Sequence, residues 1–559
     1  MISNQIRALC VLAVATIVAA VSGVGAGAAP IHTLIEGTGS SWSANAVAQW
    51  VADVNQQGME VAYTPTGSAA GRRDFSYNTN DFAVSDIPFQ GEDPLTHAKD
   101  TAEGRLYAYL PIVAGGTSFP YQIRVGGQLY LNLRLSGETV AKIFTNVITN
   151  WNDPQITADN NGHKLPSKPI IPVVHSEGSG ATAQFTRYLA NQFPTIWTAW
   201  SGIHKPTEYY PVKNNIVPQD KSDGVMNFIR SAAGDGSIGY NEYSYALGAG
   251  YPVAKLLNKN GYFTLPTDTN VAVSLTSAEI NNDPSSVEYL IQNLDKVYIK
   301  PDNRTYPLSS YSYLVLPTGK GGKDDNEHRM TTAKRQTLAD FLSYSVCIGQ
   351  RAMGPLGYSP LPINLVQASF EQITKLKTAD PLVEIAQRPV DQCNNPTFVA
   401  GHPEINRLAE IAPMPPECDK IGNGPCTGVG PGGGGGNGNG GGHGGGAGNN
   451  GRANSGGGAG GSGAAGSSST SASAEGAAGA QIDPETGQSI NGADSGTNSQ
   501  AVATPTDLAS FREATNIKII AVLLAVLLLA ALFAPPLLQQ RFAARRRGST
   551  RRDGSEDTP

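Results

Sequence analysis

The sequence predicts an α/β protein with mainly parallel sheets, divided into two lobes. Three observations support this. Short apolar stretches alternate with stretches of helical period over residues 29–420. Glycine-rich polar turns join several of these strands to the helix that follows. The chain of 559 residues is also too long for a single compact core.

The N-terminal residues 1–28 are predicted to be a signal peptide. An apolar run at residues 9–21 follows Arg7, and Ala26-Gly27-Ala28 has the small residues of a signal peptidase site. The alternative is an N-terminal membrane anchor, but this run is too short to span a bilayer.

The C-terminal part predicts a tether to the membrane. Residues 427–504 are dominated by Gly, Ser, Ala and Asn and are expected to form a disordered linker. Residues 517–538 are long and apolar enough for one transmembrane helix, and six arginines follow in the tail, residues 539–559. We therefore expect an exported protein, anchored in the cytoplasmic membrane, with an extracytoplasmic globular region and a cytoplasmic C-terminus.

The charge argues against nucleic acid as a partner. The formal net charge is -6 with the basic tail included, so the globular part is more acidic than the whole chain. The tail arginines could in principle bind nucleic acid, but their position directly behind a membrane span favours anchoring.

The cysteines predict disulfides rather than a metal site. Four remain after signal removal, at Cys347, Cys393, Cys418 and Cys426, with no C-x-x-C spacing and no histidine cluster. Three pairings are possible. We favour Cys347 with Cys393 and Cys418 with Cys426, because each pair joins near neighbours, although the sequence does not decide between the three. Three of these cysteines lie in a C-terminal extension, residues 376–426, which could be a cap, a brace or the start of a stalk.

The first elements repeat one order of strand, glycine turn and helix. A strand at 32–35 and a turn at 37–42 precede a helix at 44–56. Gly37 and Gly39 do not make a dinucleotide fingerprint, because Trp42 stands where the third glycine would be. A strand at 61–63, a turn at 66–71 with a helix through Phe75, and a strand at 81–88 follow.

The later elements extend the alternation. Their predicted positions are a strand at 112–114 that leaves the first unit, the start of another unit at 129–133 and 140–144, a helix at 225–229, a strand at 236–240, a strand at 311–316 and a helix at 333–347.

Residues 172–189, PVVHSEGSGATAQFTRYL, predict a strand, a Gly-Ser-Gly turn and a helix. Free N–H groups at the first turn of such a helix favour a bound oxyanion. The alternative is an ordinary glycine turn with Ser179 as the N-cap. Ser41, Ser68 and Asp86 lie at similar strand ends or helix starts, where α/β sheets place ligands.

No catalytic group or cofactor is predicted. Gly178-Ser179-Gly180 lacks the preceding glycine of a nucleophile elbow, and the eight histidines contain no H-x-x-x-H pair. We therefore expect no enzyme activity and no bound metal.

The order of the motifs resembles one family, the phosphate-binding receptors of Pst-type ABC importers, which have a periplasmic-binding-protein type II-like fold. The resemblance covers about residues 31–375. The matching stretches are GTGSSW at 37–42, TGSAAG at 66–71, DFAVSDIP at 81–88, LSGETVAKIFTNVITNWNDP at 135–154, HSEGSG at 175–180, SDGVMNFI at 222–229, SIGYNEYSYAL at 237–247 and GYSPLP at 357–362.

The resemblance implies two lobes joined by a hinge of two crossovers, near residues 112 and 247. Lobe 1 would comprise residues 29–112 and 248–375, and lobe 2 residues 113–247. The lobes would close on phosphate, and an ABC permease would recognise the closed form.

The resemblance also implies a set of ligand-binding residues. Asp86 can only accept hydrogen bonds, so it would select a ligand that still carries a proton, unlike sulfate. The implied set is Ser41, Trp42, Ser68, Asp86, His175, Ser179, Gly180 and Thr182.

Two positions depart from the family pattern. His175 replaces the usual Arg, and Ala181 replaces the usual Thr, with Thr182 one place later. Histidine offers at most part of a charge and no fixed fork of donors. Glu177 could hold His175 protonated, or His175 could face away from the ligand; Arg72 and Arg73 could supply the missing charge, or could be solvated. The alternative function is a receptor or scaffold module of this fold, which binds a phosphorylated metabolite or a cell-envelope polymer.

Overall fold

A computed structural model describes residues 32–319, 324, 329–386 and 389–426. The predicted signal peptide, glycine-rich linker, transmembrane helix and basic tail lie outside these residues. Within the described ranges, no helix combines the length and the hydropathy needed to cross a bilayer.

The larger sheet has six strands in the order β13-β6-β18-β3-β1-β2. Its strands are β1 (Ile35–Gly39), β2 (Val61–Thr64), β3 (Phe82–Ser85), β6 (Tyr107–Ser118), β13 (Asn241–Glu242) and β18 (Ser309–Pro317). β1 is parallel to β2 and β3, whereas β18 is antiparallel to both β3 and β6. The expectation of mainly parallel sheets is therefore wrong for this sheet, which is mixed. Strands joined by long connections can enter a sheet in either direction, and their sequence does not record which.

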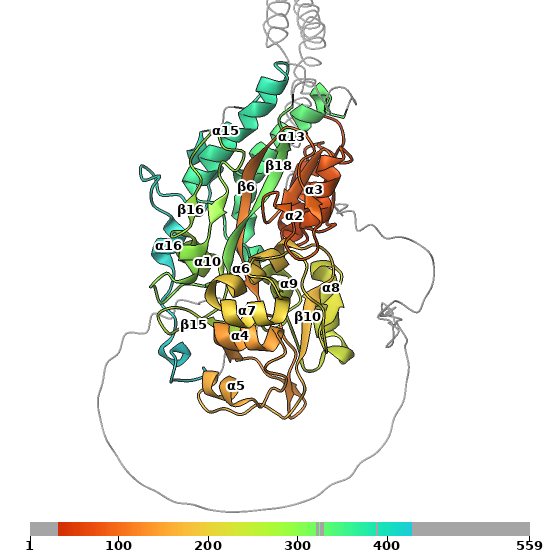
Figure 1. Cartoon of the computed structure of the whole chain (residues 1–559). Coiled ribbons are helices and arrows are strands. Elements are labelled where there is room, and N and C mark those ends of the chain that lie inside the picture. The colour runs from red at the N-terminus through yellow and green to blue at the C-terminus, as the bar shows by residue number, and fades with distance from the viewer. Residues whose placement is uncertain (1–31, 320–323, 325–328, 387–388, 427–559) are drawn as a thin grey trace, which may run out of the picture. The chain divides into compact units, whose positions relative to one another are not determined.

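Helices cover the larger sheet because each carries one apolar stripe. In α2, for example, Val47, Trp50 and Val54 are buried. α13 packs against both α2 and α15, and α15 lies along β6, as Figure 1 shows. The helices of this region are α2 (Ala44–Asn55), α3 (Ser68–Ser76), α10 (Asp268–Leu275), α11 (Asp295–Tyr298), α13 (Thr332–Ser345), α14 (Met353–Leu356) and α15 (Ile363–Ala379).

A second group of elements surrounds two three-stranded sheets, β11-β10-β12 and β15-β14-β9. Its strands are β9 (Arg134–Leu135), β10 (Ile171–His175), β11 (Val217–Gln219), β12 (Ser237–Gly239), β14 (Lys255–Leu257) and β15 (Phe263–Thr264). Its helices are α4 (Gly137–Phe144), α5 (Pro154–Asp159), α6 (Gly180–Gln192), α7 (Pro194–Ser201), α8 (Lys221–Arg230) and α9 (Tyr243–Gly248). We call these elements the small-sheet group, and the six-stranded sheet with its helices the large-sheet group.

Aromatic packing fixes α6 inside the small-sheet group. The ring of Phe185 lies 4.8 Å from that of Tyr240 and 5.1 Å from that of Phe144, measured between centroids. Such tilted and edge-on contacts add specific geometry to the burial of apolar area. The N-terminus of α6 is therefore held in a defined place.

The remaining short elements lie at the edges of both groups. They are β4 (Gly91–Glu92), β5 (Lys99–Asp100), β7 (Arg124–Val125), β8 (Gln128–Leu129), β16 (Glu279–Ile280), β17 (Gln292–Asn293), α16 (Arg407–Ile411) and four 3-10 helices at Ala232–Gly234, Ile348–Ala352, Val390–Cys393 and Glu417–Asp419.

The chain passes between the two groups along β6. This strand pairs with β18 in the larger sheet, and its last residues pair with β13. After β13 the chain returns to the small-sheet group, where α9 is followed by β14, which pairs in parallel with β9. The second crossover is implied near residue 247, but β14, which follows it, still pairs within the small-sheet group.

A buried ion pair crosses between the groups. Arg72 of α3 donates to both carboxylate oxygens of Glu208, at 2.8 Å, and also pairs with Asp100. The side chains of Arg72 and Glu208 are 0% and 3% exposed. Burial alone would lower the pKa of Arg72, but the two carboxylates outweigh it and raise that pKa above its usual range. Arg72 is therefore a charged contact between the groups.

A second buried carboxylate, Glu242, lies where the chain passes between the groups. One of its oxygens accepts a hydrogen bond from the N–H of Ser244, and the other has no partner. No Lys or Arg of the described residues pairs with it. Burial raises the pKa of Glu242 well above its ordinary value.

We expect Glu208→Gln to lower the free energy of unfolding by about 3 kcal/mol, because it leaves Arg72 with one fewer buried counter-charge. Urea denaturation measures this. Glu92→Gln is the matched control, because Glu92 pairs with His97 at an exposed site, and its stability should not change. Equal stabilities for the two variants would show that the buried pair contributes nothing.

We expect Glu242→Gln to change how stability depends on pH. Because the folded-state pKa of Glu242 is raised, folding takes up a proton, and stability falls as pH rises above the carboxyl's ordinary value. The Gln variant should lack this loss and gain stability relative to the unmodified protein between pH 5 and pH 8. The difference between the free energies of unfolding of the two proteins, measured by urea denaturation at pH 5 and at pH 8, checks the sign. The same difference at both pH values would contradict the prediction.

Candidate functional site

Asp86 follows β3 directly and is 2% exposed. Its carboxylate accepts hydrogen bonds from the hydroxyls of Ser40 at 2.8 and 2.9 Å, Ser312 at 2.8 Å and Ser68 at 3.2 Å. Burial raises the pKa of Asp86, and these serine hydroxyls offset part of the rise. The three donors occupy the acceptor capacity of both oxygens.

The N-terminus of α6 meets this cluster from the small-sheet group. A side chain at Gly180 would lie only 2.3 Å from an oxygen of Asp86 and 2.6 Å from the hydroxyl of Ser68, so only glycine fits there. The N–H of Ala69 donates to the carbonyl of Gly178 at 3.1 Å. The structure thus brings Asp86, Ser68 and Gly180 together where the two groups touch.

Ser41 lies at a neighbouring contact between the groups. Its hydroxyl is 3.0 Å from the hydroxyl of Ser222 and accepts from the Ser222 N–H at the start of α8. Trp42 is 2% exposed, and its ring packs edge-on against Tyr358. The Trp42 ring is therefore part of the core, whereas the hydroxyl of Ser41 contacts the start of α8.

His175 is buried at the end of β10. Its Nδ1 atom lies 2.8 Å from Glu177, and its ring lies 5.3 Å from that of Tyr240. Its Nε2 atom is buried without a hydrogen-bond partner. Burial would raise the pKa of Glu177, but His175 and the N–H of Lys221 outweigh it, so the net shift is downward. An ionised Glu177 thus orients the His175 ring.

Two of the predicted ligand residues, Thr182 and Ser179, lie at the start of α6. The hydroxyl of Thr182 lies 2.7 Å from that of Tyr240, inside the small-sheet group. Ser179 is the N-cap residue of α6, but its side chain makes no capping hydrogen bond. Ser179 is therefore not an ordinary N-cap.

Arg72 and Arg73 differ from each other. Arg73 is exposed, as expected of a solvated helix residue. The expectation that Arg72 is solvated is wrong, because its guanidinium is buried and pairs with Glu208 and Asp100. It lies close enough to Asp86 to lower the pKa of that carboxyl slightly, but its own donors face other partners.

Sequence reasoning missed several members of the site. Ser40 stands beside Ser41 in the same turn, so the motif contained it without distinguishing the two. Ser312 is in the middle of an apolar strand and lies 226 residues from Asp86 in the chain. Ser222 lies just before the helix predicted at 225–229. The sequence gives no sign that its hydroxyl contacts Ser41.

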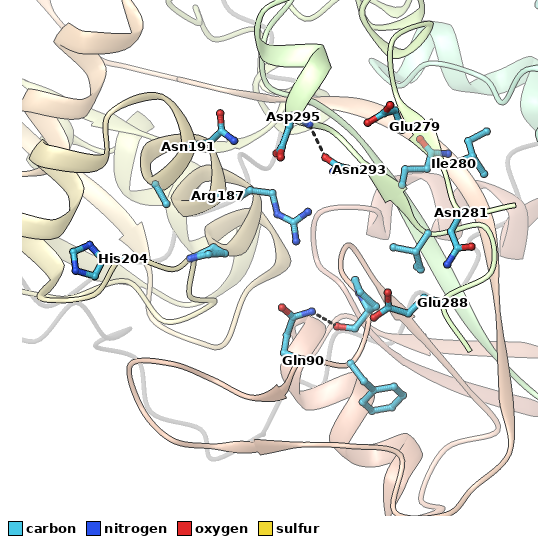
Figure 2. A pocket seen from close by; sticks show the side chains of 16 residues that line it. Gln90, Arg187, Asn191, His204, Glu279, Ile280, Asn281, Glu288, Asn293 and Asp295 are labelled. Carbon is cyan, nitrogen blue, oxygen red and sulfur yellow. Dashed lines mark hydrogen bonds between the residues drawn. The ribbon is translucent and has the colours of Figure 1, made fainter. Parts of the chain in front are cut away.

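A separate cavity of about 800 Å³ lies between α6 and the β16–β17 hairpin (Figure 2). Arg187 extends from α6 into it, with Asp295 and Glu288 on other sides. Gln292 also lines the cavity; it is 5% exposed, and its side-chain amide atoms are buried without hydrogen-bond partners. No predicted ligand residue lines this cavity.

Comparisons with known proteins agree with the motifs. The chain is 28% identical over 358 residues to the phosphate-binding protein PstS of Methanocaldococcus jannaschii, which covers 62% of this chain and 87% of that protein. It is 29% identical over 339 residues to phosphate-binding protein PstS 3 of Mycobacterium leprae, with 59% and 83% covered. A solved phosphate-binding protein from Stenotrophomonas maltophilia aligns with a TM-score of 0.43 at 16% identity, over 60% of this chain and 93% of that one.

These relatives confirm the resemblance drawn from the eight motifs. The sequence model described as the PBP superfamily domain matches residues 24–347, which is more than half of the chain. The chain belongs to the PBP superfamily.

Proposed function

We propose that the chain is an extracytoplasmic substrate-binding protein that binds inorganic phosphate, or a related protonated oxyanion, between two lobes. The large-sheet and small-sheet groups correspond to these lobes. The observation that carries the proposal is the buried carboxylate of Asp86, held by serine hydroxyls and facing Gly180 at the N-terminus of α6.

The hydrogen bonds of Asp86 favour a ligand that carries a proton. Such a ligand donates to Asp86 in place of one serine, and that serine hydroxyl then donates to a ligand oxygen. The number of hydrogen bonds is preserved. A fully ionised oxyanion accepts from the serine but leaves Asp86 short of a donor beside a second negative charge, which costs about 1–3 kcal/mol or more.

The remaining donors come from both groups. Ser41 and Ser68 belong to the large-sheet group, and the N-terminus of α6 with Ser179 and Gly180 to the small-sheet group. Free N–H groups at a helix N-terminus favour an anion. Three further residues contact the ligand in this proposal. Trp42 does so with its backbone, His175 with Nε2, and Thr182 with its backbone N–H in the first turn of α6.

We further propose delivery of the ligand to an ABC permease, and anchoring by residues 517–538. The relatives named as phosphate-binding proteins support the first part, and the apolar sequence with its basic tail supports the second. The relatives do not favour the alternative function of a scaffold module.

Isothermal titration with phosphate and with sulfate tests the function. We expect heat from phosphate and none from sulfate, and we expect phosphate affinity to fall at acid pH, as Asp86 takes up a proton at its raised pKa. Asp86→Asn should reduce the preference for phosphate over sulfate at least tenfold, whereas Asp268→Asn, a matched change at a partly buried carboxyl outside the site, should keep it. No heat from phosphate between pH 5 and pH 8 would contradict the function.

His175→Arg should tighten phosphate binding about tenfold, because a guanidinium adds charge-assisted donors where Nε2 of His175 has no partner. The dissociation constant from the same titration measures this. His97→Arg, at an exposed histidine, should leave it unchanged. If a folded His175→Arg protein binds phosphate as the unmodified one does, His175 is not part of the site.

A further inference from the structure

The C-terminal extension contacts both groups of the fold. We propose that residues 390–426, which we call the strut, hold the large-sheet and small-sheet groups at a set separation and thereby slow the release of ligand. The restraint on the separation follows from the contacts of the strut with both groups. Its effect on ligand release rests on the proposed function.

One end of the strut is fixed to the large-sheet group. A disulfide joins Cys393 to Cys347, which follows α13. Next to it, the side chains of Asn395 and Thr397 both donate to the carbonyl of Leu361, each at 2.9 Å. Both partners of these hydrogen bonds are buried, so this end does not depend on exposed contacts.

The same end continues over α10. α16 packs against α10, which itself lies on β6 and β18 (Figure 1). Arg304 donates to the carbonyl of Ala409 at 2.9 Å, and to that of Ala412 at 3.4 Å. The attachment to the large-sheet group therefore extends as far as α16, through its packing on α10.

The other end is fixed to the β15-β14-β9 sheet of the small-sheet group. Lys255 of β14 forms an ion pair with Asp419, whose side chain is 4% exposed. Arg134 of β9 donates to the carbonyl of Cys418 at 2.9 Å, and Tyr262 donates to Glu417 at 2.8 Å. The three consecutive residues 417–419 therefore each contact this sheet or the strand connection beside it.

A disulfide closes that segment on itself. Cys418 pairs with Cys426, and within the loop the N–H of Ile421 donates to the carbonyl of Gly261 at 2.8 Å. Together with Cys347–Cys393, this confirms the pairing of near neighbours that the sequence favours. Because the disulfide restricts the conformations of this loop, the residues that bond to the sheet stay close to their partners.

Proline stiffens the stretch between the two ends. Residues 413–416 read Pro-Met-Pro-Pro, and Ala412 and Pro416 have extended backbones with ψ of 125° and 147°. Such a segment acts as a semi-rigid spacer of about 3.1 Å per residue, or about 16 Å from Ala412 to Glu417. A stiff spacer resists both shortening and lengthening, so a change in the angle between the groups must strain it.

Distance measurements on the full chain test the strut. Nitroxide labels at Tyr77→Cys and Val147→Cys, which are 67% and 63% exposed and lie in different groups, report the separation by double electron–electron resonance. Without phosphate we expect one narrow distance distribution. Replacing Pro413, Pro415 and Pro416 by glycine should at least double its width and speed phosphate release severalfold.

Two further variants sharpen the test. Met414→Ser changes an exposed residue of the same stretch but keeps the prolines, so the distribution should stay narrow. Tyr262→Phe removes one contact of the far end and should broaden it by a smaller amount. Equal widths for the glycine variant and the unmodified protein overturn the strut. If neither protein binds phosphate, the proposed function fails, and the widths still decide the strut.

Discussion

The burial of one carboxylate, Asp86, constrains much of this fold. A charged group inside a protein is costly unless donors surround it, and here the donors come from three separate parts of the chain. Ser40 follows β1, Ser68 begins α3, and Ser312 lies on β18. The register of β18 against β3 pairs Tyr313 with Ser85, which places Ser312 beside Asp86. Strand order, strand direction and helix position must all be right for Asp86 to keep these three donors.

The contacts between the two sheet groups are polar wherever they surround this carboxylate. Ser41 meets Ser222, Gln184 donates to the carbonyl of Asp86, and Arg72 meets Glu208. Polar groups can exchange one another for water at modest cost, whereas separated apolar faces cannot. Separation of the two groups at these contacts therefore costs less than separation of apolar faces of the same size. Arg72 and Glu208 are the exception, because they form an ion pair whose two side chains are both buried.

The sequence predicted those parts of the site that depend on local pattern. Asp86, Ser68 and Gly180 each stand at a strand end or a helix start, and the structure brings them together. Ser312 could not be found this way, because its role comes from an antiparallel pairing that no local pattern records. Arg72 was misplaced for a related reason: helical period shows which residues share a face, but not that a loop such as the one with Glu208 covers that face. The mixed direction of the larger sheet has the same origin.

The strut proposed above connects the two groups without contacting the residues around Asp86. Two groups joined without a restraint can take many relative orientations, and each of these adds to the entropy of the separated state. A stiff connection anchored on both groups removes many of these orientations, so less entropy is lost on closing. The prolines at 413–416 supply the stiffness, and the buried ion pair of Lys255 with Asp419 supplies the far anchor. The family match ends at residue 347, so residues 390–426 lie outside the matched domain.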